Sequence, residues 1–170
     1  MTAILARQAP SDHAALRRVF GQYPSGLVVV AALGPDGPAG IVASSFTSVS
    51  LDPPLVSVNI ARTSTTLPVL RGVEDWGVSV LADDQSAVAD LLRRPATERF
   101  DGIDWTSTDA GAVHIDGVAA GFHTRVHRIV PAGDHVIALL AVTNHFTSPE
   151  SGPLVFHRSR FHRLEQENPS

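Results

Sequence analysis

The chain has 170 residues, enough for one domain that buries a core without covalent cross-links. It contains no cysteine, which excludes a disulfide framework, a thiol nucleophile and a thiolate zinc site. The formal net charge is −4, and the cations, all of them arginine, are spread along the chain without the basic stripe of a nucleic-acid-binding protein. There is no signal-peptide pattern and no apolar run of about 20 residues. We therefore expect a cytoplasmic protein that binds neither nucleic acid nor a membrane.

The first half of the chain predicts one helix, several strands and strong turns. Residues 1–13 are expected to form a flexible arm before a domain over residues 14–164. Ser11 or Asp12 can cap a helix that places Leu16, Val19 and Phe20 on one face. The following elements are strands at 26–33, 39–43 and 55–60, a Gly/Pro turn at 34–38, and a helix at 64–71.

The second half is richer in strands. It predicts a strand at 76–81, a helix from Asp83 or Asp84 to Leu92, and a loop at 99–111. Long strands at 118–130 and 135–147 flank a turn at 131–134, and strands at 153–156 and 160–164 are expected to complete the sheet, before a tail at 165–170. Many short strands with few helices favour a mainly β, closed barrel with helices packed outside it.

A hydroxyl-rich segment runs from Ser44 to Ser50 and precedes Asp52-Pro53-Pro54. One interpretation is an edge strand with a polar outer face. The other is a cradle for a planar, acceptor-rich ligand, because hydroxyls can hydrogen-bond ring carbonyls or a phosphate without full charge.

Asn59 to Thr66 is a second hydroxyl-rich segment, and it leads into the predicted helix at 64–71. Ser64 or Thr65 can act as an ordinary helix cap. Alternatively the hydroxyls, with Arg62 and the helix N-terminus, can bind a phosphate.

Gly133-Asp134-His135 lies at the start of a long predicted strand. It can be a plain hairpin turn, or a turn that places an imidazole against a ligand. His123 and His127 lie four residues apart without a paired acid at metal-ligand spacing, and His157 and His162 lie in an Arg-rich tail where surface positions are expected, so no metal site is expected.

Several short segments lie in a characteristic order along the chain. They are Pro24-Ser25-Gly26, Ser44–Ser50 with Asp52-Pro53-Pro54, Arg62–Pro68, Glu98-Arg99-Phe100, Gly133-Asp134-His135 and Pro153–Phe156. In this order they resemble the flavin reductase family with the FMN-binding split-barrel fold, over nearly the whole chain. The resemblance implies a closed split β-barrel of Greek-key-like topology with a few peripheral helices, and a homodimer with flavin near the subunit interface.

The resemblance also implies which residues bind the cofactors. Those expected beside the isoalloxazine ring are Val42, Ala43, Ser44 and Ser45, with Ser48 in the same hydroxyl cluster. Those expected to hold the ribityl chain and phosphate are Ser57, Val58, Asn59, Thr63, Ser64 and Thr65. The nicotinamide turn would be Gly133, Asp134 and His135, with His135 as the catalytic residue. Residues expected to close or complete the site are Arg99, Phe100, Phe156 and Arg158.

The implied reaction is hydride transfer from NADH or NADPH to FMN or FAD, with the reduced flavin passed to a separate flavin-dependent monooxygenase. Such a reaction requires alignment of two rings and no protein acid or base. Two alternatives stay open: a flavoprotein that keeps its FMN and reduces another acceptor, and a non-catalytic flavin-binding protein. At or near Ser79, Leu140 and Ser159 the chain departs from the asparagine, glycine and glycine that are common in the family.

Overall fold

The structure, a computed structural model, describes residues 12–164, so the expected arm and tail lie almost wholly outside the described residues. The helical segments are α1 (His13–Phe20), α2 (Leu67–Arg71), α3 (Ser86–Leu91) and the 3-10 helix η1 (Ala96–Glu98). The strands are β1 (Ser25–Gly26), β2 (Val28–Gly34), β3 (Gly37–Ala43), β4 (Thr47–Leu51), β5 (Pro54–Ala61), β6 (Asp75–Val80), β7 (Trp105–Ser107), β8 (Val113–Ile115), β9 (Ala120–Ala132), β10 (His135–Thr147), β11 (Val155–His157) and β12 (Arg160–His162). None of the helices within residues 12–164 has the length and apolar character that crossing a membrane requires.

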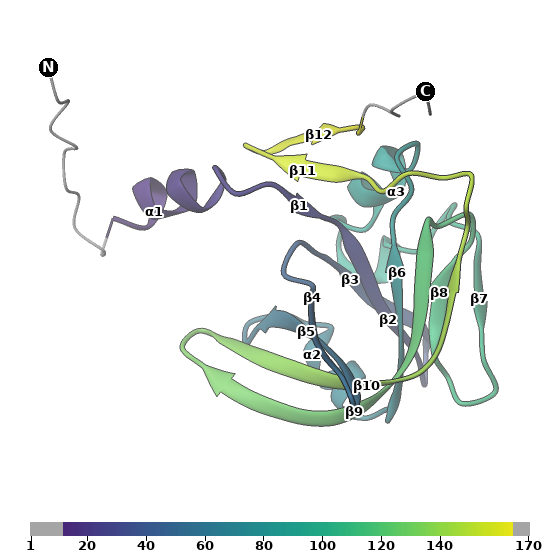
Figure 1. Cartoon of the computed structure of the whole chain (residues 1–170). Helices are drawn as coiled ribbons and strands as arrows, with labels where there is room; N and C mark the ends of the chain where they lie inside the picture. The colour runs from purple at the N-terminus through teal and green to yellow at the C-terminus, as the bar shows by residue number, and fades with distance from the viewer. Residues whose placement is uncertain (1–11, 165–170) are drawn as a thin grey trace, which may run out of the picture.

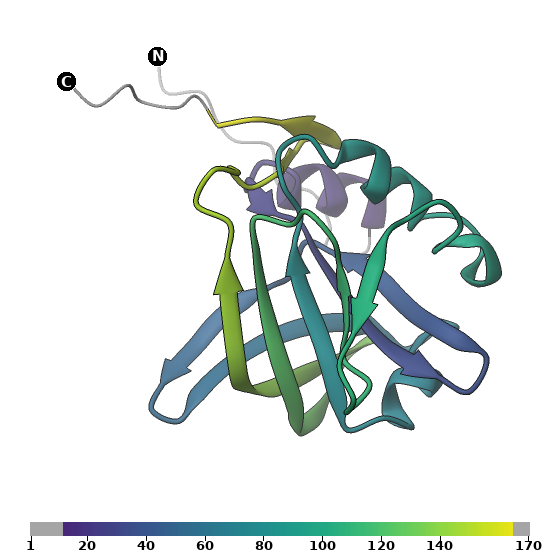
Figure 2. The same cartoon turned by 90° about the vertical axis from the view of Figure 1, so that its right-hand side faces the viewer.

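The fold is mainly β, as expected, and its largest part is one seven-stranded antiparallel sheet in the order β3-β2-β6-β9-β10-β5-β4. Figures 1 and 2 show that this sheet is strongly curved around the core. Successive side chains of a strand point to opposite faces, so every second residue is buried over most of β5 and the first half of β10, as with Val58, Ile60, Val136 and Ala138.

β2 is buried on both faces, which accounts for its continuous apolar run. Val28 and Val30 belong to the core inside the curved sheet. Val29 and Ala31 belong to a second core, on the other face, which α3 and β8 cover. A strand covered on both sides needs apolar residues at every position.

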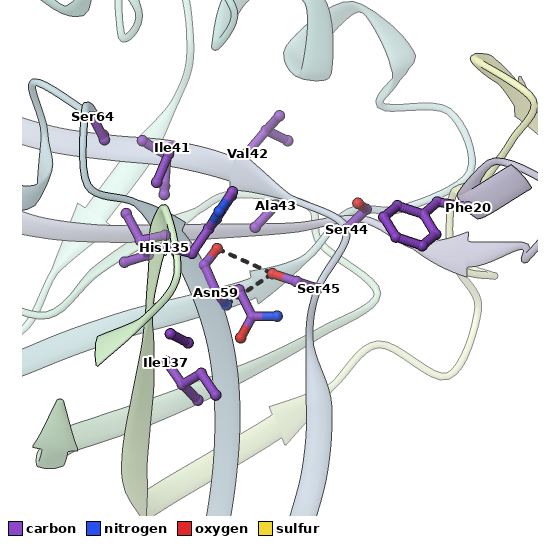
Figure 3. A pocket seen from close by; sticks show the side chains of 13 residues that line it. Phe20, Ile41, Val42, Ala43, Ser44, Ser45, Asn59, Ser64, His135 and Ile137 are labelled. Carbon is purple, nitrogen blue, oxygen red and sulfur yellow. Dashed lines mark hydrogen bonds between the residues drawn. The ribbon is translucent and has the colours of Figure 1, made fainter. Parts of the chain in front are cut away.

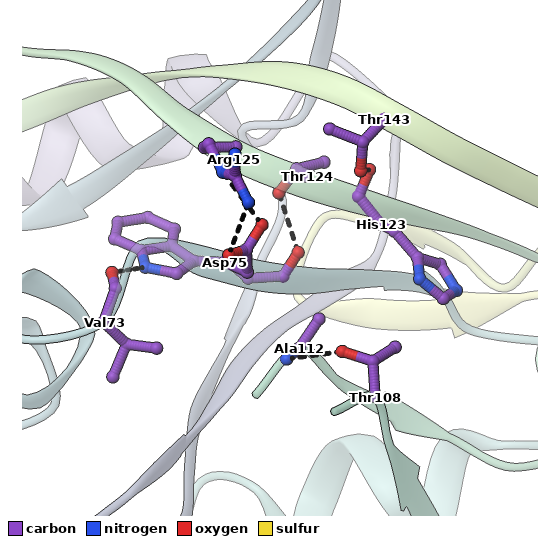
Figure 4. A network of polar contacts seen from close by, with 9 residues as sticks. Val73, Asp75, Thr108, Ala112, His123, Thr124, Arg125 and Thr143 are labelled. Atoms are coloured by element: carbon purple, nitrogen blue, oxygen red, sulfur yellow. Dashed lines mark hydrogen bonds and ion pairs between the residues drawn. The ribbon is translucent and has the colours of Figure 1, made fainter. Parts of the chain in front are cut away.

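A set of polar contacts joins β6 to β9 and to the segment before β6 (Figure 4). The indole of the fully buried Trp76 donates to Val73 O at 3.0 Å, and Thr124 Oγ1 donates to Trp76 O at 2.8 Å. Arg125 bonds both carboxylate oxygens of Asp75 at 3.2 Å. The contacts of Trp76 and Thr124 satisfy polar atoms inside the sheet, whereas the Arg125–Asp75 pair is exposed to solvent.

The expectation of a closed barrel is wrong. β3 and β4 are consecutive in the chain, yet they form opposite edges of the sheet and do not pair with each other. In the segment between them, Ser45 Oγ accepts from Asn59 N at 2.9 Å and donates to Asn59 O at 3.2 Å. The serine side chain thus takes both backbone groups of Asn59 that the β4–β5 ladder would use next, so that ladder ends at the pair Thr47–Ser57.

The expectation that the last two strands complete the main sheet is also wrong. β11 and β12 form a hairpin, and β11 pairs with β1 in a separate three-stranded sheet. Phe156 and Phe161 pack on the second core with ring centroids 5.9 Å apart, and Arg93 lies over both rings. β2, which follows β1, already pairs with β3 along one edge and with β6 along the other. The apolar hairpin therefore packs against α3 on the second core and does not join the main sheet.

α1 begins as expected but does not pack as expected. Asp12 Oδ1 accepts from Ala15 N at 2.9 Å, which caps the helix. Ala15 is its one buried residue, whereas Val19 is 63% and Phe20 66% exposed. The apolar face predicted for this helix therefore lies at the surface of the single chain.

α2 and α3 both start later than predicted. Ser64 Oγ accepts from Thr66 N at 3.3 Å, so Ser64 stabilises a turn and the helix begins at Leu67. α3 begins after Gln85, whose side chain accepts from Ala82 N at 2.9 Å, and not at the two aspartates before it. A local side-chain bond displaces the helix start in each case.

Candidate functional site

A pocket of about 680 Å³, called the first pocket, lies between the end of β3, the end of β5 and the start of β10 (Figure 3). Its lining is apolar with a few polar groups. The lining residues are Phe20, Ile41, Val42, Ala43, Ser44, Ser45, Asn59, Ile60, Ala61, Ser64, Ala132, His135 and Ile137. The structure thus brings together seven of the predicted site residues: Val42, Ala43, Ser44, Ser45, Asn59, Ser64 and His135.

Strand pairing explains why distant segments meet here. In the register of β5 and β10, His135 is opposite Ala61 and Ile137 is opposite Asn59. These four residues lie on the face away from the core, because their neighbours Ile60 and Val136 are buried in it. The pairing places an imidazole and an amide on one wall of the pocket.

The turn before β10 is attached to the end of β5. Gly133 has a φ of 62°, a left-handed conformation that glycine adopts without strain. Arg62 N donates to Asp134 O at 2.9 Å, and the Arg62 guanidinium reaches Gly133 O at 3.5 Å. This attachment sets the position at which His135 enters the pocket wall.

The ring of His135 is oriented by Asp134, whose Oδ1 lies 2.7 Å from His135 Nδ1. The hydrogen bond from His135 lowers the pKa of the Asp134 carboxyl below its ordinary value, and the charge of the imidazole adds to this. Nδ1 is the nitrogen engaged with the carboxylate, so Nε2 is the one available to a ligand.

Other predicted residues on β4, β5 and the following turn do not line the pocket. Val58 is fully buried in the core, so its side chain cannot touch a ligand there. Ser57 lies on the same face of β5 as Asn59, but below the pocket. Ser48, Thr63 and Thr65 are exposed and are not among the lining residues.

Arg99 and Phe100 lie behind the lining strand and not in the pocket. Arg99 Nη1 donates to Gly40 O at 3.0 Å and to Thr66 Oγ1 at 2.8 Å, and burial lowers the pKa of its guanidinium. Phe100 packs edge-on against Trp105. Arg99 therefore fixes β3 against the turn before α2, and its contribution to the pocket is indirect.

Phe156 and Arg158 line a second hollow of about 220 Å³, next to the first pocket. The two hollows share Phe20 and Ser44 as lining residues. Ser79, a departure from the family pattern, lies in neither: it is fully buried, and its Oγ accepts from Ile115 N at 3.2 Å.

Sequence reasoning missed the apolar part of the lining and the aromatic ring at its edge. The missed residues are Phe20, Ile41, Ile60, Ala61, Ala132 and Ile137. The alternation of β10 offered one signal, since Ile137 is two residues from His135. The remaining residues look like ordinary strand or helix positions, and only the curvature of the sheet brings them to the pocket.

Comparison with known proteins shows which family the chain belongs to. The family model described as flavin reductase like domain matches residues 20–165. An NADH-dependent FAD reductase from Streptomyces globisporus is 37% identical, over 96% of this chain and 94% of that protein. The reductase component of a flavin-dependent trigonelline monooxygenase from Acinetobacter baylyi is 37% identical over 86% of this chain. This chain spans only 47% of that relative, and 58% of the stachydrine N-demethylase reductase subunit from Rhizobium meliloti.

Solved structures share the fold. The NADH:FAD oxidoreductase SgcE6 from Streptomyces globisporus, in complex with NAD and FAD fragments, superposes with a TM-score of 0.89 at 34% identity, over 96% of this chain and 100% of that one. BorF, the flavin reductase component of a bacterial two-component tryptophan halogenase, superposes with a TM-score of 0.82 at 34% identity, over 92% of this chain and 100% of that one. With the family match over most of its length, the chain belongs to the flavin reductase like domain family.

Proposed function

We propose that this chain is an NAD(P)H:flavin oxidoreductase that binds FMN or FAD, uses NADH or NADPH, and supplies reduced flavin to a separate monooxygenase. The observation that carries the proposal is the first pocket, where hydroxyls, an amide and the His135 imidazole surround one apolar hollow. Family membership and the likeness to reductase components of two-component systems support it.

The lining fits a flavin. A volume of about 680 Å³ falls within the usual range of ligand pockets, roughly 300–1,000 Å³. Ile41, Val42 and Ile137 offer apolar walls for a planar ring, and the hydroxyls of Ser44 and Ser64 can donate to its carbonyls or to a phosphate. No carboxylate of the described residues lines the pocket, so an anionic ligand meets no like charge there.

When bound, flavin supplies the two-electron acceptor for the nicotinamide. The part played by the chain is positional. Asp134 orients His135 at the edge of the pocket, where the imidazole can contact the nicotinamide side of the site. The apolar walls exclude water from the faces of the rings, and alignment then accounts for the rate without an acid–base pair.

We propose that the chain acts as a homodimer. Phe20 lines the pocket from α1 while 66% of it is exposed, and the nearby Tyr23 is 80% exposed. A second copy packed over this end would remove both rings from water and cover the open side of the pocket. Light scattering at micromolar concentration is expected to show a dimer, and a monomer with full reductase activity would contradict this part of the proposal.

The reaction is tested by adding NADH under argon to flavin-loaded protein. Fast bleaching of the flavin absorbance is expected. No bleaching with flavin bound would identify a non-catalytic binding protein. FMN that stays bound through gel filtration and passes its electrons to another acceptor would identify the flavoprotein alternative.

The flavin site is tested by a matched pair of variants. Ser64 lines the pocket and Thr65 is exposed beside it. Ser64→Ala should weaken FMN binding about tenfold, the effect of losing one hydrogen bond to a charged group of about 1.5 kcal/mol. Thr65→Ala should leave it within twofold, and an equal effect of the two variants on FMN affinity would show that Ser64 makes no special contact.

A further inference from the structure

The turn between β11 and β12 is strained in an unusual way. His157 pairs with Arg160, so Arg158 and Ser159 alone form the turn. Their φ angles are 50° and 62°, in the left-handed region, and neither residue is glycine. Such two-residue hairpin turns strongly prefer sequences such as Asn-Gly, because a side chain costs free energy at these angles. Strain of this kind persists where the surrounding structure holds it in place, often at a functional site.

This turn brings Arg158 against Gly21 and Gln22, the two residues that follow α1. Arg158 N donates to Gly21 O at 3.1 Å, and Arg158 Nε donates to Gln22 Oε1 at 2.9 Å. A second guanidinium nitrogen, Nη2, also contacts Gln22 Oε1. A guanidinium has five N–H donors, so this anchorage orients Arg158 and still leaves donors for an anion.

Arg158 faces the second hollow, which also receives Arg17 from α1. The rest of the lining is neutral: Phe20, Gly21, Tyr23, Ser25, Ser44, Phe156 and Ser159. Within residues 12–164 the carboxylates that form ion pairs are Asp75, Asp90 and Asp134, and none pairs with Arg17 or Arg158. Two arginines and several hydroxyls therefore converge on one small hollow of a chain whose net charge is −4.

The second hollow adjoins the first pocket. Phe20 and Ser44 line both, so a ligand whose ring lies in the first pocket can extend past these residues toward the two arginines. Arginine is the side chain best suited to bind phosphate, because its planar fork matches two phosphate oxygens.

We propose that the second hollow is a phosphate subsite, in which Arg17 and Arg158 bind the phosphate carried by the adenosine half of a dinucleotide. The proposal rests on the proposed function, since it requires a ring ligand in the first pocket. That half is present in FAD and in NADH, and it is absent from FMN and from reduced nicotinamide mononucleotide. The subsite therefore selects dinucleotides over mononucleotides.

The test compares each dinucleotide with its mononucleotide. Affinities for FAD and FMN, and for NADH and reduced nicotinamide mononucleotide in the presence of FMN, are measured for the parent chain, Arg158→Gln and Arg17→Gln. Each variant should weaken the binding of one dinucleotide at least tenfold, equivalent to about 1.4 kcal/mol. The affinity for the matching mononucleotide should stay within twofold of the parent value. Weaker binding of FAD would identify the flavin as the source of the phosphate. Weaker binding of NADH would identify the nicotinamide cofactor as its source.

The controls separate charge from structure. Arg160→Gln removes the same charge from the same hairpin, but Arg160 does not line the second hollow, so affinities should not change. Arg17 is in α1 and not in the strained turn, so Arg17→Gln remains informative if Arg158→Gln unfolds the hairpin. Equal losses for dinucleotide and mononucleotide, or no loss in Arg17→Gln, would overturn the subsite. A parent chain that binds no flavin at all would overturn the proposed function instead.

Discussion

His114 is a buried histidine that should make the stability of the fold sensitive to acid. It lies on β8 with 5% of its surface exposed, and its ring stacks on His123 with centroids 4.5 Å apart. Ser79 Oγ lies 3.4 Å from His114 Nδ1, and the buried His114 Nε2 has no hydrogen-bond partner among residues 12–164. Burial lowers the pKa of His114 from 6.5 to about 4, and repulsion from His123 contributes to this.

The direction of the pH effect on stability follows from the difference in proton binding between the folded and unfolded chain. The pKa in the folded state lies below that of the unfolded chain, so the unfolded chain binds the proton more tightly. His114 therefore costs no stability above about pH 6.5, destabilises the fold progressively as the pH falls toward 4, and adds nothing further below that. At about 1.4 kcal/mol for each tenfold change in proton affinity, the upper limit is roughly 3 kcal/mol. Since the stacked His123 is partly open to solvent, we expect about 2 kcal/mol.

The measurement is the free energy of unfolding in urea between pH 7.5 and pH 4.5, for the parent chain and for His114→Gln. The parent should lose about 2 kcal/mol more than the variant over this range. An NMR titration of the His114 imidazole provides the direct check. An imidazole that titrates near 6.5 in the folded protein, or a variant with the same pH dependence as the parent, would refute the reasoning.

Three further predictions concern single residues. Gly77→Ala places a Cβ 1.9 Å from Val113 O, a backbone atom of β8, and should destabilise the fold by about 4 kcal/mol or more in thermal unfolding. In the control Gly26→Ala the new Cβ meets no atom of the described residues within 4 Å, so stability should change little. Similar losses of stability in the two variants would contradict the clash at Gly77. Ser159→Gly relieves a φ of 62° and should stabilise the fold by about 1 kcal/mol, so a lower melting temperature would show that the turn is not strained. His135→Ala should leave flavin affinity nearly unchanged. In stopped-flow experiments it should slow flavin reduction by NADH about tenfold, a change of about 1.4 kcal/mol in the activation free energy. An unchanged reduction rate at all NADH concentrations would exclude a role for His135.

Much of the site could be predicted because its polar residues lie in short, ordered segments. Ser44 and Ser45 belong to a dense hydroxyl cluster, and His135 follows a Gly-Asp turn; both segments line the pocket. The prediction was less accurate where a residue's face of the sheet mattered. Val58 lies between two predicted site residues, but alternation along β5 turns it into the core.

Arg99 shows the same limit for a charged residue. Its position in a recognisable segment says nothing about which way its side chain runs. In the folded chain it donates to the nearby Arg94 O, and also to Gly40 O and Thr66 Oγ1, which are both distant from it in sequence. Those acceptors become neighbours only after β3 and α2 have packed.

The sequence by itself determined the mainly β character, the order of the strands along the chain and most of the turns. These depend on local chemistry: the period of the apolar residues, and the glycines and prolines between them. The tertiary structure alone decided that the edge strands β3 and β4 stay unpaired with each other, that β11 pairs with β1, and that two hollows share Phe20 and Ser44. Each of these is a contact between segments far apart in sequence, and its free energy depends on how a curved sheet brings them together, which no local pattern encodes.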